Sequence, residues 1–106
     1  MIYEIASLPV KADRLSAFKA AFGDVAHLLA RARGYEGHLL TQGVETPSQF
    51  TLIVRWQTLE DHTQGFEPSN DHRIFMAGLE AYLAAEPLVY HVQAEDSAKE
   101  LDILAK

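Results

Sequence analysis

The chain has 106 residues, which fits one compact domain, and its shares of apolar (48%) and charged (23%) residues are typical of a folded globular protein. Its 15 acidic and 9 basic residues give a net charge of −6, so we expect neither nucleic acid nor a membrane surface as a partner, because both are anionic. The absence of cysteine excludes disulfides, thiolate nucleophiles and cysteine-ligated metal centres.

The first predicted elements are a strand and an amphipathic helix. Residues Ile2–Leu8 favour a strand, and Pro9 ends it because proline cannot donate a ladder hydrogen bond. From Leu15 onward, apolar residues recur in steps of three and four, which predicts a helix with one apolar face: Phe18, Phe22, Val25, Leu29 and Ala32. Gly34 follows two arginines, a combination typical of a helix C-terminus.

The next two runs predict a β-hairpin. They are Tyr35–Val44 and Gln49–Trp56, and the polar residues 45–48 separate them. Because side chains alternate along a strand, the second run has one wholly apolar face, made of Phe50, Leu52, Val54 and Trp56. The opposite face carries Thr51, Ile53 and Arg55.

A second helical region is predicted to be broken near its start. Thr58 begins a capping-box pattern, so a short helical turn is expected to carry His62. Gly65 and Pro68 interrupt that turn, and Ser69 offers a new N-cap. The helix that follows has these apolar residues: Phe75, Met76, Leu79, Tyr82 and Leu83.

Residues Pro87–Gln93 predict a last strand, and the charged residues 94–106 form a tail that either frays or packs on a partner. The order strand, helix, strand, strand, helix, strand (βαββαβ) is the split βαβ or ferredoxin-like α+β pattern, here expected over residues 1–93. Both helices then cover one face of a four-stranded antiparallel sheet. No apolar run approaches the roughly 18 residues of a membrane helix, and residues 1–10 do not resemble a signal peptide, so we expect a cytoplasmic protein.

The uncovered face of this sheet is expected to be too apolar for water. We assign to it Ile53, between Thr51 and Arg55, and Val89, close to His91. Stacking a second sheet on it buries these side chains, so the sequence predicts a homodimer.

Five histidines, one tryptophan and scattered carboxylates remain as candidates for chemistry. His62 and His72 do not have the spacing of a helical zinc pair, and neither a glycine-rich phosphate loop nor a Gly-x-Ser-x-Gly elbow is present. We therefore expect no metal and no nucleotide cofactor.

Two interpretations stay open for each leading candidate. Trp56 is either a core residue or the aromatic wall of a binding site. His62 and His72 are either exposed histidines near helix starts or polar groups that line a cavity between the helical turns. His27 is predicted to lie on the surface. His38 and His91 lie on strands, where cross-strand or interface roles are expected.

The segment from Trp56 to His62 (Trp-Gln-Thr-Leu-Glu-Asp-His), followed by Phe66, Ser69 and a helix, resembles the antibiotic biosynthesis monooxygenase family of dimeric α+β barrels. The resemblance covers residues 1 to about 93. It implies two ferredoxin-like sheets packed back to back and a pocket between sheet and helices in each subunit. It also implies oxidation of quinols or polycyclic aromatic substrates by O2 without flavin or metal.

A subset of the family degrades heme, and that branch pairs the tryptophan with an Asn on the first strand and a His on the second helix. The first strand here has Ala6 and Ser7 instead, and His72 lies about a turn too early, so heme degradation is disfavoured.

The hypothesis is a homodimeric barrel whose pocket binds a small aromatic or quinol-like substrate and O2, with no cofactor. The expected pocket walls are Trp56, Phe50, Phe66 and Phe75. His62 or His72 is expected to act as the base or orienting group, since histidine titrates near neutral pH. The alternative is a non-catalytic ligand-binding or stress-related protein of the same fold.

Overall fold

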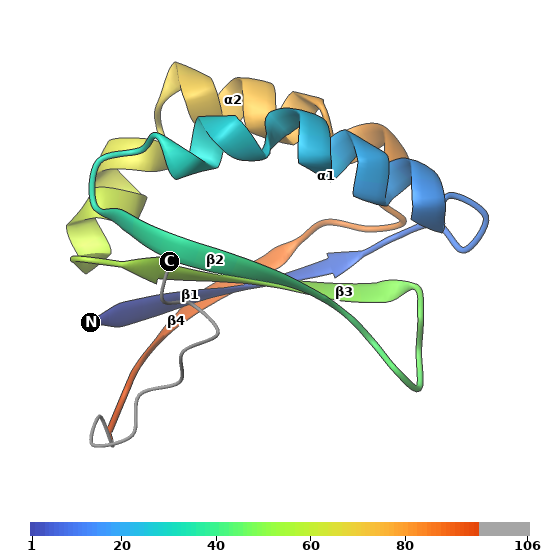
Figure 1. Cartoon of the computed structure of the whole chain (residues 1–106), viewed down its shortest axis with the longest axis horizontal. Helices are drawn as coiled ribbons and strands as arrows, with labels where there is room; N and C mark the ends of the chain where they lie inside the picture. The colour runs from blue at the N-terminus through green and yellow to red at the C-terminus, as the bar shows by residue number, and fades with distance from the viewer. Residues whose placement is uncertain (96–106) are drawn as a thin grey trace.

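The computed structural model describes residues 1–95, in which two helices lie across one face of a four-stranded antiparallel sheet (Figure 1). The predicted ferredoxin-like α+β fold and its βαββαβ order are confirmed. The strands and main helices are β1 (Ile2–Pro9), α1 (Leu15–Ala30), β2 (Tyr35–Gln42), β3 (Gln49–Trp56), α2 (Asn70–Ala77) and β4 (Leu88–Gln93).

The strand order is β2-β3-β1-β4, so β1 lies inside the sheet and β4 forms one edge. Ala6 of β1 is opposite Leu52 of β3 on one side and opposite Val89 of β4 on the other. This register brings the inward-facing residues of three strands to the centre of the sheet, under the helices.

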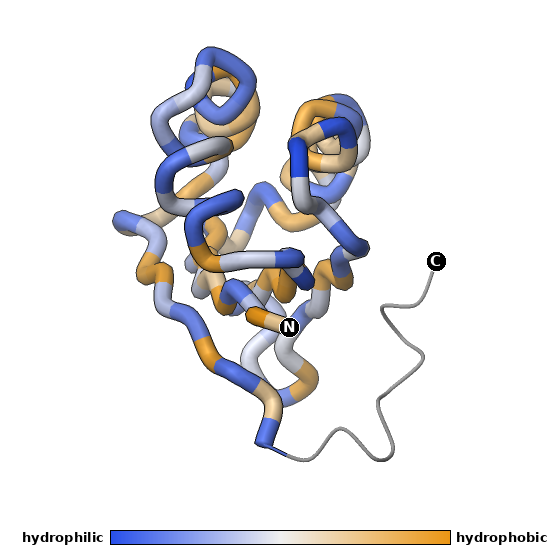
Figure 2. Tube along the Cα trace, turned by 90° about the vertical axis from the view of Figure 1, so that its left-hand side faces the viewer, coloured by the Kyte–Doolittle hydropathy of each residue, from blue (hydrophilic) through white to orange (hydrophobic). Residues whose placement is uncertain are grey.

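The apolar face of α1 builds one half of the core. Phe18, Phe22, Leu28 and Leu29 are buried against the sheet, and Figure 2 shows the two helices nearly end-on above it. Gly34 follows the helix with a φ of +84°, a left-handed conformation that favours glycine. A Cβ atom at Gly34 would also overlap the side chain of Asp61. Both the backbone conformation and the available space therefore require glycine here.

The second helical region is broken, as predicted, and both predicted caps are present. The Asp61 backbone N–H donates to Thr58 Oγ1 at 3.1 Å, and the His72 N–H donates to Ser69 Oγ at 3.1 Å. Between the caps lies a π-helical turn, Asp61–Phe66, here called η1. The helix α2 ends at Ala77, earlier than its apolar pattern indicates, and a 3₁₀ turn at Glu80–Tyr82 follows.

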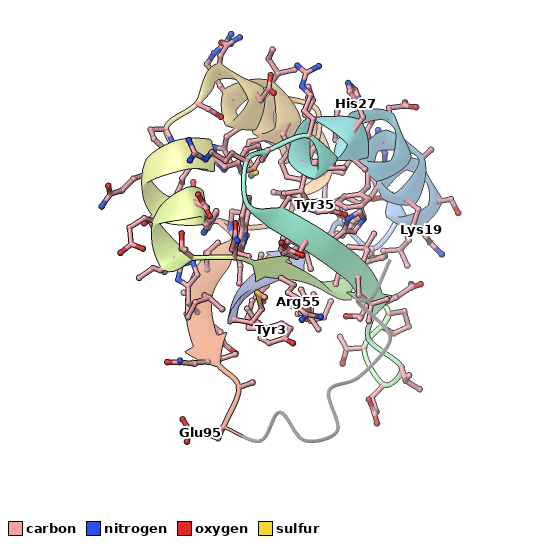
Figure 3. All side chains as sticks on the ribbon, turned by 60° about the vertical axis from the view of Figure 1, so that its left-hand side comes forward. Tyr3, Lys19, His27, Tyr35, Arg55 and Glu95 are labelled. Atoms are coloured by element: carbon pink, nitrogen blue, oxygen red, sulfur yellow. The ribbon has the colours of Figure 1, made fainter. Side chains whose placement is uncertain are left out.

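One face of the sheet is covered by the helices and the other is exposed. The assignment of Val89 and His91 to the exposed face, made from the sequence, is wrong. Val89 and His91 face the helices, because they pair with Ala6 and Glu4 on the inward face of β1. The outward residues of β4 are Leu88, Tyr90 and Val92, which are 65%, 50% and 43% exposed. Figure 3 shows Tyr3 and Arg55 on this same outward face, away from the helices.

Two further sequence predictions concern the C-terminal tail and the lack of a membrane-spanning helix. The predicted charged tail, residues 94–106, lies outside the described residues apart from Ala94 and Glu95. Within residues 1–95, none of the helices combines the length and the apolar character needed to cross a bilayer.

Candidate functional site

A cavity of about 290 Å³ lies between the sheet and the helices. Much of its wall is apolar and includes Ala6 and Leu52 from the sheet and Phe66, Phe75 and Leu79 from the helical side. Its polar wall consists of five titratable residues: Glu4, His62, Glu67, His72 and Glu86. The volume is near the lower end of the roughly 300–1,000 Å³ typical of ligand pockets, which suits a small molecule.

Glu4 is the most unusual of these residues, because it is an acid on the inward face of an inner strand. It is only 7% exposed, and its Oε1 accepts a hydrogen bond from Trp56 Nε1 at 3.0 Å. Burial raises its pKa to about 7, the tryptophan hydrogen bond lowers it, and the nearby charge of Glu67 raises it. Glu4 therefore titrates near neutral pH.

His62 is held against Glu4 by the π-helical turn. The Glu67 N–H donates to the His62 carbonyl at 2.8 Å, the five-residue step of a π-helix. The His62 ring stacks on Trp56 with 5.2 Å between centroids, and its Nε2 lies 3.3 Å from Glu4 Oε1. Burial lowers the pKa of His62 to about 4, and the nearby rings of His91 and His72 add to this shift.

The contact between Glu4 and His62 is therefore not an ion pair near neutral pH. Burial moves both pKa values toward the neutral forms, so between about pH 4 and pH 7 a protonated Glu4 faces a neutral imidazole. The other ring nitrogen of His62, Nδ1, lies 2.7 Å from Nε2 of His91 on β4 in a hydrogen bond. Each nitrogen of the buried ring thus faces a titratable group.

His72 lines the same cavity from the first turn of α2. Its ring packs edge-on against Phe66 with 5.3 Å between centroids, and burial lowers its pKa. A neutral imidazole can accept a proton, so the cavity has two basic side chains besides the Glu4 carboxyl.

Comparisons with known proteins agree with this architecture. Residues 1–78 match the family model for antibiotic biosynthesis monooxygenases. The chain belongs to the antibiotic biosynthesis monooxygenase family. The resemblance found from the sequence is therefore confirmed.

Family relatives cover nearly the whole described chain. The uncharacterized protein YczJ of Bacillus subtilis is 34% identical over 93 residues, which are 88% of this chain and 98% of that protein. A candidate antibiotic biosynthesis monooxygenase from Bordetella bronchiseptica superposes with a TM-score of 0.84 at 34% identity, covering 88% of this chain and 95% of that one. SnoaB of Streptomyces nogalater, described as a cofactor-independent oxygenase, has a TM-score of 0.79 at 15% identity, covering 93% and 97%, and so shows the shared fold.

The residues that the sequence singled out fall in two groups in this family member. His62, His72, Phe66 and Phe75 line the cavity together. Trp56 and Phe50 are 0% and 1% exposed and are core residues that do not belong to the lining. Trp56 nevertheless contacts two residues that line the cavity: it donates a hydrogen bond to Glu4 and stacks on His62.

Sequence reasoning missed Glu4 and His91. The signal for Glu4 was present, because Ile2, Glu4, Ala6 and Leu8 alternate on one face of a predicted strand, which places a carboxyl among apolar neighbours. His91 had no comparable signal, since its position follows from its pairing with Glu4 across two strands.

The histidines and carboxylates of this site were also considered as metal ligands. Within residues 1–95, the structure has no group of three or more His, Asp or Glu side chains arranged to hold a metal ion. Neither ring nitrogen of His62 is directed at an open position, because Nε2 faces Glu4 and Nδ1 faces His91.

Proposed function

We propose that this protein is a cofactor-independent monooxygenase that oxidises a small aromatic or quinol-like substrate with O2. The observation that carries the proposal is a cavity of about 290 Å³ with apolar and aromatic walls and a buried carboxyl that titrates near neutral pH. Membership in the monooxygenase family supports it, as does the description of the structural relative SnoaB as a cofactor-independent oxygenase.

In the proposed reaction the substrate is its own reductant. A phenol loses its hydroxyl proton to the protein, and the electron-rich anion forms a carbon–oxygen bond with O2 at a ring carbon that bears hydrogen. Protonation gives a hydroperoxide. Loss of that ring hydrogen and cleavage of the O–O bond then release water and leave a carbonyl, so that one phenol and one O2 become one quinone and one water.

Three side chains on the cavity wall are candidates for the proton acceptor: His62, His72 and Glu4. A general base works best when its pKa lies near the operating pH. Glu4, at about 7, meets this condition better than His62, at about 4. The proposed acceptor is therefore the Glu4 carboxyl in contact with His62, and His72 is the orienting group on the opposite, helical wall.

Aromatic side chains hold the ring in this proposal. Phe66 and Phe75 line the cavity and pack edge-on with 6.1 Å between ring centroids, so the helical side offers aromatic contact area to a flat ligand. Trp56 packs against Phe66 with 5.8 Å between ring centroids and holds Glu4 in place through its N–H. Closing such a site to water protects the reactive anion and the hydroperoxide from side reactions with solvent.

The outward face of the sheet supports a homodimer as the working form. Ile5, Leu39 and Ile53 lie side by side on this face at paired positions, next to the exposed Leu88, Tyr90 and Val92 of β4. Burying one such side chain is worth about 1.5–3 kcal/mol, so a second copy stacked on this face stabilises the fold substantially. Light scattering tests the assembly, since a persistent folded monomer of 11.8 kDa at micromolar concentration contradicts it.

Oxygen uptake tests the reaction directly. Protein freed of metal and flavin is mixed with hydroquinone and a panel of electron-rich phenols in an oxygen electrode, and fluorescence of the single tryptophan reports binding. We expect uptake, with a loss of about 10²–10⁴-fold in the Glu4→Gln variant and in the His62→Ala/His72→Ala double variant. His27→Ala, on the exposed side of α1, is the matched control.

The outcome separates the two functions considered from the sequence. Phenols that bind without any O2 uptake refute the monooxygenase and favour a ligand-binding protein of the same fold. A panel that neither binds nor reacts refutes the proposed substrate class.

A further inference from the structure

Three titratable side chains stand in a row that leads from the cavity to the edge of the sheet. Glu4 Oε1 on the inner strand β1 lies 3.3 Å from His62 Nε2 on η1. His62 Nδ1 in turn shares a hydrogen bond of 2.7 Å with His91 Nε2 on the edge strand β4. The middle ring is held in place by stacking on Trp56.

Burial separates the two inner groups of this row from solvent, so their protons can exchange with water only through a neighbouring side chain. Glu4 is 7% exposed and His62 is 2% exposed, so bulk water has little direct access to either group. Glu4 lines the cavity, so a ligand bound there would cover its remaining open side. His91 is partly exposed and lies on an edge strand, where water can exchange protons with its ring.

We propose that Glu4, His62 and His91 form a proton-transfer chain that connects the cavity to solvent at the β4 edge. Its role in turnover rests on the proposed function, because a carboxyl that gives and takes protons in an occupied cavity needs a route for resetting its charge. Glu4 is the candidate catalytic residue, and His62 and His91 are the residues that connect it to water.

Hydrogen-bond chemistry defines the steps. An ionised Glu4 only accepts, so a neutral His62 carries its proton on Nε2 and accepts from His91 Nε2–H at Nδ1. A proton from water binds His91 Nδ1, the His91 Nε2–H bond breaks as His62 Nδ1 gains a proton, and the His62 Nε2–H proton passes to Glu4 Oε1. One proton enters, one carboxylate is neutralised, and both rings stay neutral but change tautomer. The reverse sequence carries a proton out.

Other charged groups around the chain adjust the pH at which it switches. Glu67 and Glu86 line the same cavity as Glu4, and the charge of Glu67 favours its protonated form. His72 faces the cavity from α2, and its charge disfavours protonation of His62. Trp56 donates to Glu4 in either charge state of the carboxyl.

The proposal predicts that two histidine rings change tautomer together as Glu4 titrates. Long-range nitrogen–proton NMR on protein labelled with ¹⁵N-histidine identifies which ring nitrogen carries the proton, and no ligand is needed. We expect His62 and His91 to have Nε2–H above the titration midpoint of Glu4 and Nδ1–H below it. His38, whose Nδ1 is hydrogen-bonded to the Tyr35 hydroxyl at 2.6 Å, is the internal control and keeps one tautomer through that titration.

Three variants locate the connection. Glu4→Gln, which keeps the shape and an oxygen acceptor but does not titrate, abolishes both tautomer changes. His62→Gln abolishes the change at His91, and the matched control His27→Gln leaves both changes intact. The chain is refuted if His62 keeps one tautomer throughout, if His91 fails to change with it, or if the changes persist in Glu4→Gln.

This experiment is independent of turnover. A protein that consumes O2 without linked tautomer changes retains the proposed function and loses the chain. A protein with linked changes and no O2 uptake keeps the chain as a property of the fold and loses the monooxygenase.

Discussion

Glu4 and His62 make opposite contributions to the pH dependence of folding, and this opposition can be measured. The pKa of Glu4 rises on folding from its usual 4.5 to about 7, so in this range the folded chain holds a proton that the unfolded chain releases. Its contribution to stability is complete below pH 4.5 and is lost as the pH rises through about 7. The pKa of His62 falls from 6.5 to about 4, so its contribution is complete above pH 6.5 and is lost as the pH falls.

Between pH 4.5 and pH 6.5 both residues differ in protonation between the folded and unfolded chains. Each then changes the free energy of unfolding by up to about 1.4 kcal/mol per pH unit. The change across the window is about 2 kcal/mol, because each group is only partly titrated at the ends, and the two signs are opposite. The two contributions nearly cancel in the native chain. Removing either one exposes the other.

Urea unfolding followed by the fluorescence of the buried Trp56 measures this at a fixed protein concentration. The stability of the native chain minus that of Glu4→Gln should fall by about 2 kcal/mol from the lower to the upper end of the window. The difference for His62→Gln should rise by about the same amount. Subtracting each variant from the native chain cancels the titration of all groups that do not interact with the substituted residue. Differences that change in the same direction for both variants, or remain flat, refute the assignment of neutral forms to this pair.

Three further predictions test other parts of the structure. Gly34→Ala should destabilise the fold by about 1–3 kcal/mol, because of its φ of +84° and the overlap with Asp61, whereas Gly23→Ala, with open space around it in α1, should stabilise by about 0.5–1 kcal/mol in the same urea titration. Trp56→Phe removes the N–H that lowers the pKa of Glu4, so carboxyl ¹³C NMR should find that pKa above about 7, while Tyr35→Phe should leave it unchanged. Benzoate should bind more weakly than benzyl alcohol in calorimetry, because the cavity wall contains Glu4, Glu67 and Glu86 and, among the described residues, no lysine or arginine; equal affinities contradict this.

Local patterns in the sequence predicted most of the fold. The alternation of Phe50, Leu52, Val54 and Trp56 placed the correct face of β3 toward the helices, because residues two apart on a strand share a side. Thr58 and Ser69 marked both helix starts, because a cap acts within three residues of itself. These features depend on neighbours along the chain, so sequence is sufficient to find them.

Local patterns could not predict which face of β4 points toward the helices. Leu88 and Val92 are as apolar as Val89, and Tyr90 alternates with His91, so alternation alone allows either face of β4 to point toward the helices. Pairing with β1 decides, because Ala6 is opposite Val89 and Glu4 is opposite His91. A shift of one residue in that register would reverse every side chain of the strand.

The candidate site was predictable only in part for the same reason. The sequence by itself determined that His62 lies in an irregular helical turn after Trp56, whereas Glu4 was not predicted as a site residue. Only the tertiary structure brought the two together, since the five-residue step of η1 and the stacking on Trp56 set the direction of the His62 ring. Burial of that contact then shifts both pKa values, and burial depends on packing between segments far apart in the chain.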